Sequence, residues 1–139
     1  MNTNIKGTIT ELKCQTYFLE LGYNVSIPLS PDRYDFILDF NNELLKIQVK
    51  TSSTRKDGEA FYFQTSSSHF VKGQHTHSTY KEDNIDYFAT CWENQVYLIP
   101  VEECGAREKN LRIMPTRNGQ VKGICFAKDY IAEEVLKRR

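Results

Sequence analysis

The apolar positions of the chain first recur at helical spacing and then change to strand-like alternation. Between Thr8 and Leu21 apolar residues return every three or four positions, and Gly22 follows where a helix end is expected. This pattern predicts a helix over residues 8–21. Alternating or β-favouring runs then predict strands over residues 23–29, 34–40, 44–52, 60–65, 87–92, 95–100 and 111–114.

The remaining segments are polar or turn-like. Residues 66–83 contain Gly73 and three histidines and are predicted to form a long loop. Turns are expected at residues 30–32, 41–42, 93–94 and 118–119, and a closing helix over residues 126–137. A first helix, a block of strands and a last helix favour an α/β or α+β fold with a mixed sheet, in one domain spanning residues 1–139.

Composition narrows the class of protein. Of the 139 residues 40% are apolar, which suffices for a packed core. No apolar run approaches the roughly 20 residues of a membrane-spanning helix, and the first residues lack the apolar stretch of a secretory signal. A cytoplasmic location without a membrane partner is therefore expected. The four cysteines, at positions 14, 91, 104 and 125, form no Cys-x-x-Cys pair and are interpreted as reduced, mostly buried thiols.

Charge is balanced, with 18 Lys plus Arg and 18 Asp plus Glu. Bulk charge therefore gives no indication of nucleic-acid binding. A DNA-binding surface would need local segregation of charge, or pairing of several copies of the chain.

The most informative segment is the pair of strands around Asn41-Asn42. Asn tolerates positive φ, so this dipeptide suits a two-residue hairpin turn that sets the strand register. Counting back from the turn pairs Phe40 with Glu43, Leu38 with Leu45, Phe36 with Ile47 and Tyr34 with Val49. The same count places Asp35 opposite Gln48, with Lys50 diagonal to Asp35 on the same face.

An acid, an amide and an ammonium group on one face suit metal-assisted phosphodiester hydrolysis. Carboxylate and amide oxygens are hard ligands of the kind that Mg²⁺ prefers. A lysine beside the attacking water can help to deprotonate or orient it and can stabilise phosphate charge. The alternative interpretation is an ordinary surface hairpin whose polar residues alternate outward.

These residues resemble the motif of the PD-(D/E)XK nuclease superfamily, which includes type II restriction enzymes and Holliday-junction resolvases. The resemblance rests on Glu11 in the first helix, Asp35 on one strand and Gln48-Val49-Lys50 on the next. In the small bacterial branch that contains group I intron homing endonucleases, Gln replaces the usual acid in a run similar to residues 45–51. Further similarity runs through residues 22–28, 86–88 and 97–100. The resemblance implies a restriction-endonuclease-like α/β core, with a mixed central β-sheet flanked by helices.

The resemblance also implies a role for each of these residues. Asp35 would be the central metal ligand, Gln48 would ligate through its side-chain oxygen, and the Val49 carbonyl could add a backbone ligand. Lys50 would serve the attacking water. Gln48 carries one negative charge less than the usual acid, so metal binding should depend more on Asp35 and on Glu11. The expected ion is Mg²⁺, for which Mn²⁺ can substitute.

Two carboxylates have competing interpretations. Thr8-Ile9-Thr10-Glu11 has the pattern of a capping box, in which Glu11 reaches back to the N-cap amide, so capping and metal binding both stay open for this residue. Pro31-Asp32 spells the literal start of the family motif, but Asp32 is expected in a turn before the strand. The role in the motif is therefore assigned to Asp35.

Candidate DNA contacts come from basic residues and from the polar segment. The candidates are Arg55, Lys56, Lys72, His75, His77, Arg112 and Arg117. Each of them taken singly is more typical of an ordinary solvated surface. The His-x-His pattern could bind zinc, but no further ligand set accompanies it. A DNA-contacting loop and an inert surface loop are the two interpretations kept for residues 66–83.

The sequence therefore predicts a Mg²⁺-dependent endonuclease that cleaves double-stranded DNA at a specific site. One chain of this size has little surface for a long site, and cutting two strands needs two active sites. We therefore expect a homodimer or homotetramer on a partly palindromic target. Two rival hypotheses are a structure-selective nuclease, such as a Holliday-junction resolvase or repair enzyme, and a catalytically silent DNA-binding module.

Overall fold

Five strands form the central sheet of the protein. In the computed structural model their spatial order is β1 (Asn24–Ser26), β2 (Phe36–Phe40), β3 (Glu43–Val49), β8 (Tyr87–Trp92) and β9 (Gln95–Pro100). Neighbouring strands are antiparallel except for β3 and β8, which run parallel, so the sheet is mixed as predicted. The structure describes residues 1–71, 74–79 and 84–139, and for residues 67–71 and 74–79 it describes the backbone alone.

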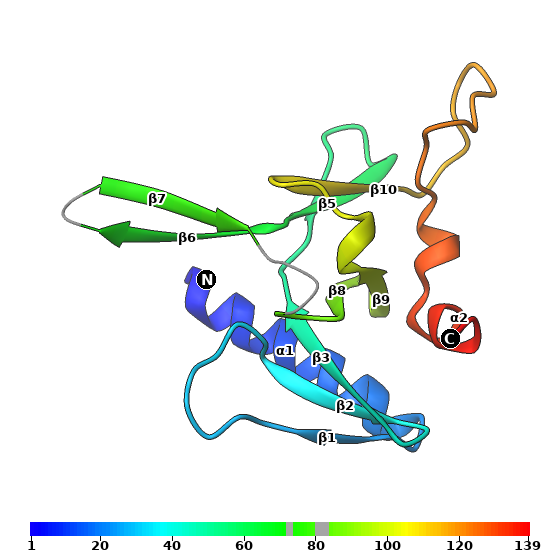
Figure 1. Cartoon of the computed structure of the whole chain (residues 1–139). Coiled ribbons are helices and arrows are strands. Elements are labelled where there is room, and N and C mark those ends of the chain that lie inside the picture. The colour runs from blue at the N-terminus through cyan, green and yellow to red at the C-terminus, as the bar shows by residue number, and fades with distance from the viewer. Residues whose placement is uncertain (72–73, 80–83) are drawn as a thin grey trace.

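Different layers cover the two faces of this sheet (Figure 1). The helices α1 (Thr3–Glu20) and α2 (Ala132–Lys137) pack on one face, where Cys14 and Phe18 meet the apolar residues of β2 and β3. The other face is covered by a three-stranded sheet, in the order β10 (Glu108–Arg112), β5 (Ala60–Gln64) and β4 (Ser53–Thr54). Two short 3-10 helices, η1 (Val101–Glu103) and η2 (Ala127–Tyr130), add to this second layer.

A hydrophobic core lies on each face of the central sheet, because successive side chains of a strand point to opposite faces. In β8 the side chains of Tyr87 and Ala89 join the core under the helices, whereas Phe88 joins the core under the small sheet. In β9 the residues Val96 and Leu98 face the helices and Ile99 faces the small sheet. Strands that are covered on both faces need nearly continuous apolar sequence, and β8 and β9 have it.

The hairpin between β2 and β3 has the predicted register. Asn41 and Asn42 have φ of 48° and 69°, the left-handed values that a tight two-residue turn requires. The structure pairs Phe40 with Glu43, Leu38 with Leu45 and Phe36 with Ile47. A second turn of the same kind, at Glu93-Asn94, joins β8 to β9 with the predicted bounds.

Several predicted boundaries are wrong. The first helix begins at Thr3 rather than Thr8, and its N-cap is Asn2, whose side chain accepts hydrogen bonds from the amides of Asn4 and Ile5. The capping box at residues 8–11 is therefore not a helix start, and Glu11 lies well inside the helix. The closing helix is divided at Ile131, where the backbone is extended and pairs with Tyr97.

Several strands also differ in length from the prediction: β2 begins at Phe36 rather than at residue 34, and β3 covers Glu43–Val49 rather than residues 44–52. β1 ends at Ser26, shortly before Pro28, which has no amide hydrogen for a ladder. β10 begins at Glu108, three residues before the predicted start, because its backbone pairs with the whole of β5 whatever the polarity of its side chains.

The loop predicted over residues 66–83 is wrong for residues 66–71 and 74–79, and the rest of that range lies outside the described residues. The two described stretches form an antiparallel two-stranded ribbon of β6 (Ser66–Val71) and β7 (Gln74–Thr79). The ribbon projects from the rest of the protein on the side where α1 begins (Figure 1). Backbone pairing does not require apolar side chains, so hydrophobic periodicity does not detect such a ribbon.

Candidate active site

Glu11 reaches the central sheet from the inner side of α1. It lies one helical turn before Cys14, whose side chain is fully buried, and Glu11 itself is half-buried at the edge of that face. Asn4, Gly7 and Thr8 precede it at intervals of three and four residues and therefore share its side of the helix. This row of residues forms one wall of a cleft.

Asp35 lies directly before β2 rather than inside it, which corrects the predicted placement by one residue. Its amide donates to the carbonyl of Ile47 over 2.8 Å, and its Oδ2 accepts the amide of Val49 over 2.7 Å. The carboxylate thus takes the place of a backbone acceptor at the end of the β2–β3 ladder. One backbone and one side-chain hydrogen bond to β3 thus hold Asp35 at the edge of the sheet.

Glu11 and Asp35 are in contact across the cleft. Burial of the carboxyl group, together with a hydrogen bond and charge repulsion from Asp35, raises the pKa of Glu11 from 4.5 to about 7. Burial and a neighbouring negative charge both disfavour the charged form of a carboxyl group, so at neutral pH Glu11 is protonated part of the time. Metal binding, one of the two interpretations of Glu11, agrees with this location, whereas helix capping does not.

Gln48 and Val49 form the sheet side of the same cleft. Its volume is about 400 Å³, and it is lined by Thr3, Asn4, Gly7, Thr8, Glu11, Asp35, Gln48, Val49 and Thr51. The Gln48 amide donates to the Val49 carbonyl over 3.3 Å, which keeps these two oxygen-bearing groups together. Two carboxyl groups, an amide and a peptide carbonyl thus meet at one end of β3.

Lys50 lies beside this cleft but is not one of the residues that line it. Its ammonium group donates to the carbonyl of Ser66 over 3.3 Å, and its amide donates to Ala89 over 2.9 Å. Burial lowers the pKa of Lys50, the charge of Asp35 opposes that change, and Arg33 adds to it. The structure thus brings Lys50 within the field of Asp35, while its ammonium group bonds to the first residue of β6.

Several residues of the cleft were not predicted from the sequence. Thr3, Asn4 and Thr8 follow from helical spacing once the helix is begun at Thr3, so the Asn2 cap was the signal that could have found them. Thr51, whose hydroxyl lies 3.5 Å from that of Thr10, continues the motif strand. The contact between Lys50 and Ser66 had no signal, since it joins two elements across a gap of 16 residues.

The donor set is chemically suited to a hard divalent cation. All of its groups are oxygen donors, and Mg²⁺ commonly binds one or two carboxylates and keeps several waters. Within the described parts of the chain no three His, Cys, Asp or Glu side chains gather into a metal cluster, so a softer site of the zinc type is not found there.

The described basic residues that were predicted to contact DNA are divided between the second layer and the ribbon of β6 and β7. Arg55 bonds to Asn110 and Glu108 and stacks on the ring of Tyr62 at 3.8 Å, while Lys56 is exposed in the turn that follows. His75 and His77 lie on β7, and Lys72 lies outside the described residues.

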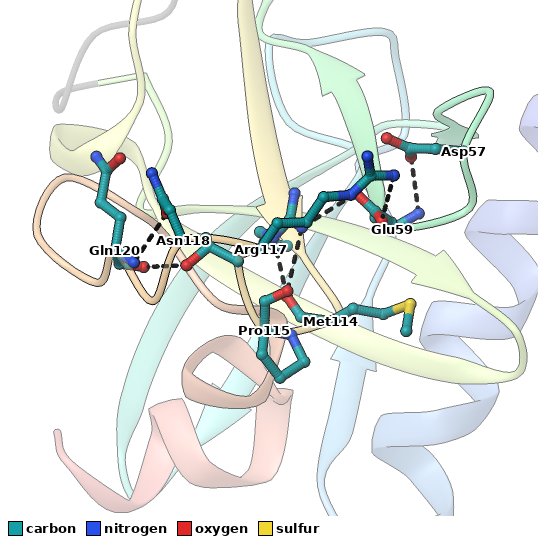
Figure 2. Close-up of polar contacts among 9 residues, drawn as sticks. Asp57, Glu59, Met114, Pro115, Arg117, Asn118 and Gln120 are labelled. Atoms are coloured by element: carbon teal, nitrogen blue, oxygen red, sulfur yellow. Dashed lines mark hydrogen bonds and ion pairs between the residues drawn. The ribbon is translucent and has the colours of Figure 1, made fainter.

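Glu59 organises the two remaining arginines. Its carboxylate pairs with Arg112 at 3.1 Å and with Arg117 at 3.2 Å, and its amide donates to Asp57 (Figure 2). Arg112 also donates to the carbonyls of Met114 and Pro115, whereas the side chain of Arg117 stays 83% exposed. Arg112 therefore serves to anchor the loop after β10, and Arg117 is the arginine that solvent can reach.

The fold and the cleft define a restriction-endonuclease-like protein, with a helix-borne acid, an Asp at a strand start and a Gln-x-Lys run on the adjoining strand. A family model described as PD-(D/E)XK endonuclease matches residues 1–133, and the chain belongs to this family. The predicted family and α/β fold are thus confirmed.

One solved structure shares this fold over nearly the whole chain. It is that of the bacterial homing endonuclease I-Ssp6803I, with a TM-score of 0.79, 23% sequence identity, and coverage of 99% of this chain and 95% of that one. Comparison with curated proteins found no match. Among the described residues, no helix is long and apolar enough to cross a membrane.

Proposed function

We propose that this protein is a Mg²⁺-dependent endonuclease that hydrolyses phosphodiester bonds in double-stranded DNA at a specific site. The observation that carries the proposal is the contact between Glu11 and Asp35 in an open cleft that Gln48 and Val49 also line. Membership of the PD-(D/E)XK endonuclease family supports nuclease chemistry. The shared fold with a homing endonuclease supports the choice of one specific site over general degradation.

Four groups are proposed to hold the metal ion. They are the carboxylates of Glu11 and Asp35, the side-chain oxygen of Gln48 and the carbonyl of Val49, with Mn²⁺ as a substitute for Mg²⁺. Bound metal would supply Lewis-acid activation of the scissile phosphate and of water. With a pKa of about 7, Glu11 loses its proton near neutral pH, and a bound cation would favour its charged form.

Lys50 is proposed to act on the attacking water and on the phosphate. Its ammonium group lies in the field of Asp35, and burial lowers its pKa. The hydrogen bond to the Ser66 carbonyl restricts the position of the ammonium group, whose charge would stabilise a phosphate bound beside the cleft. Gln48 keeps the net charge of the cleft less negative than an acid would, which favours approach of the DNA backbone.

The ribbon of β6 and β7 is proposed as a DNA-contacting element. It begins at Ser66, next to Lys50, and projects from the body of the protein (Figure 1). A two-stranded ribbon fits the major groove of B-DNA, where base edges can be distinguished. His75 and His77 lie on this ribbon and remain candidates for contacts to DNA.

Cleavage of supercoiled plasmid tests the proposal. We expect the wild-type protein to cut with Mg²⁺ and not with EDTA, and expect Asp35→Asn and Lys50→Ala to lose about 100-fold or more in rate. Asp32→Asn, in the literal Pro-Asp sequence, and Lys122→Ala, an exposed lysine, are matched controls that should keep the wild-type rate. Equal cutting by all five proteins would identify a contaminant and refute the enzyme hypothesis.

A second substrate pair separates this proposal from its structure-selective rival. Linear duplexes that carry many different sequences should be cut only at a defined sequence. Preferential cutting of four-way junctions, without regard to sequence, would instead indicate a resolvase.

A further inference from the structure

The side of α1 that points away from the sheet carries an apolar stripe. We define this outer stripe by Ile5, Ile9, Leu12, Thr16 and Leu19. Its four large apolar side chains are 51%, 36%, 55% and 51% exposed, in that order. A surface helix normally has polar residues opposite its buried face, so a contiguous apolar row there indicates a contact surface.

The spacing of the outer stripe is that of a coiled-coil seam. Successive members lie four, three, four and three residues apart, which is the heptad interval that keeps a helix against a partner helix. The buried residues Thr10, Cys14 and Phe18 lie on the opposite side of the same helix. One helix thus has two apolar sides, and among the side chains that the structure describes, packing buries the inner one.

We propose that the outer stripe pairs two copies of this chain, with their α1 helices antiparallel. Charge along the helix favours this partner and this direction. Lys6, Lys13 and Glu20 are exposed and follow one flank of the stripe at intervals of seven residues. Antiparallel pairing brings Lys6 at one end toward Glu20 of the partner subunit, and the symmetry repeats this pair at the other end. Parallel pairing would instead place the two lysine flanks on opposite faces of the pair, and neither Lys6–Glu20 pair would form.

This pairing also determines where the two clefts lie. Asn4, Thr8 and Glu11 are on the flank of α1 opposite to the lysine flank. A two-fold axis perpendicular to two antiparallel helices keeps each flank on its own side of the pair. Both clefts therefore open on the same face of the dimer, where a single duplex can reach both. This last step depends on the proposed function, whereas the pairing of helices does not.

Mass in solution tests the pairing. We expect sedimentation velocity at micromolar concentration to give an even-numbered oligomer for the wild type and half that mass for Leu12→Glu. Leu44→Glu is the matched control, because Leu44 is 67% exposed on β3, away from the stripe, and should keep the wild-type mass. Circular dichroism should show an unchanged helix content in Leu12→Glu, since Glu is a good helix former at an exposed position. A monomeric wild type, or a Leu12→Glu variant of wild-type mass, would overturn the proposal.

Charge reversal tests the direction of the helices without touching the apolar stripe. Lys6→Glu and Glu20→Lys should each raise the dissociation constant about tenfold, and the double variant should return to the wild-type value. Failure of the double variant to recover would exclude the antiparallel arrangement.

Plasmid cleavage tests the helix pairing and the proposed nuclease function separately. If Leu12→Glu is monomeric but neither it nor the wild type cuts DNA, the helix pairing stands and the proposed nuclease function fails. If the pairing and the nuclease function are both correct, Leu12→Glu should nick plasmid rather than linearise it.

Discussion

Replacing Glu11 by Gln should remove the loss of unfolding free energy that occurs when Glu11 ionises at higher pH. In the folded protein the pKa of Glu11 is raised from 4.5 to about 7, so folding favours the protonated form. This contribution is fully present below pH 4.5 and is lost as pH rises through about 7. The difference in pKa corresponds to about 3.4 kcal/mol at full strength, and solvent at the open cleft reduces this to about 1–2 kcal/mol. Gln mimics the protonated acid, including its hydrogen bond to Asp35, and does not titrate.

Urea unfolding in EDTA measures this effect directly. We expect the Glu11→Gln variant to gain about 1–2 kcal/mol in unfolding free energy over the wild type between pH 5 and pH 8.5. Glu133→Gln, an exposed position on α2, is the matched control and should show a constant difference from the wild type. A pH-independent difference for Glu11→Gln would refute the raised pKa of Glu11, of which burial is the largest cause and the neighbouring Asp35 the second.

Four further predictions follow from other contacts. Added Mg²⁺ should raise the unfolding temperature of the wild type more at pH 8 than at pH 6, because Glu11 must lose its proton, and should have little effect on Asp35→Asn in a thermal-shift assay. Leu38→Ala, at a fully buried position, should cost about 2–5 kcal/mol in urea unfolding, whereas Leu44→Ala in the same hairpin should cost less than about 1 kcal/mol. Glu93→Asn should stabilise by about 0.5–1 kcal/mol, because Glu93 has a φ of 47° that Asn adopts more easily; an unchanged midpoint would contradict that turn geometry. Cys14 should stay unreacted with a thiol reagent at pH 8 until the protein unfolds, since burial raises the pKa of its thiol and leaves it 0% exposed; labelling of Cys14 in the native protein would show that this core opens.

Local patterns were sufficient for the elements that carry the motif. Asn41-Asn42 and the alternation on both sides of it specify one register, because a slip of β2 by one residue would turn Phe36 and Leu38 away from the face that they share with Ile47. The hairpin of β8 and β9 was equally predictable, since its apolar runs are continuous and its turn is short. The neighbourhood of Asp35, Gln48 and Lys50 followed from the register of the first hairpin, apart from the strand boundary.

Contacts between segments that are distant in the sequence determine the order of the strands and the meeting of Glu11 with Asp35. The parallel pairing of β3 with β8 joins strands about 40 residues apart, and no local signal specifies such a partner. Hydrophobic periodicity likewise does not reveal the β6–β7 ribbon, whose ladder depends on backbone groups. The approach of Glu11 to Asp35 depends on the packing of α1 against the sheet, which buries Cys14 and Phe18 and brings the acid to the end of β3. Local chemistry could therefore nominate the residues of the cleft, but only tertiary packing decides which carboxyl groups meet and what their pKa values become.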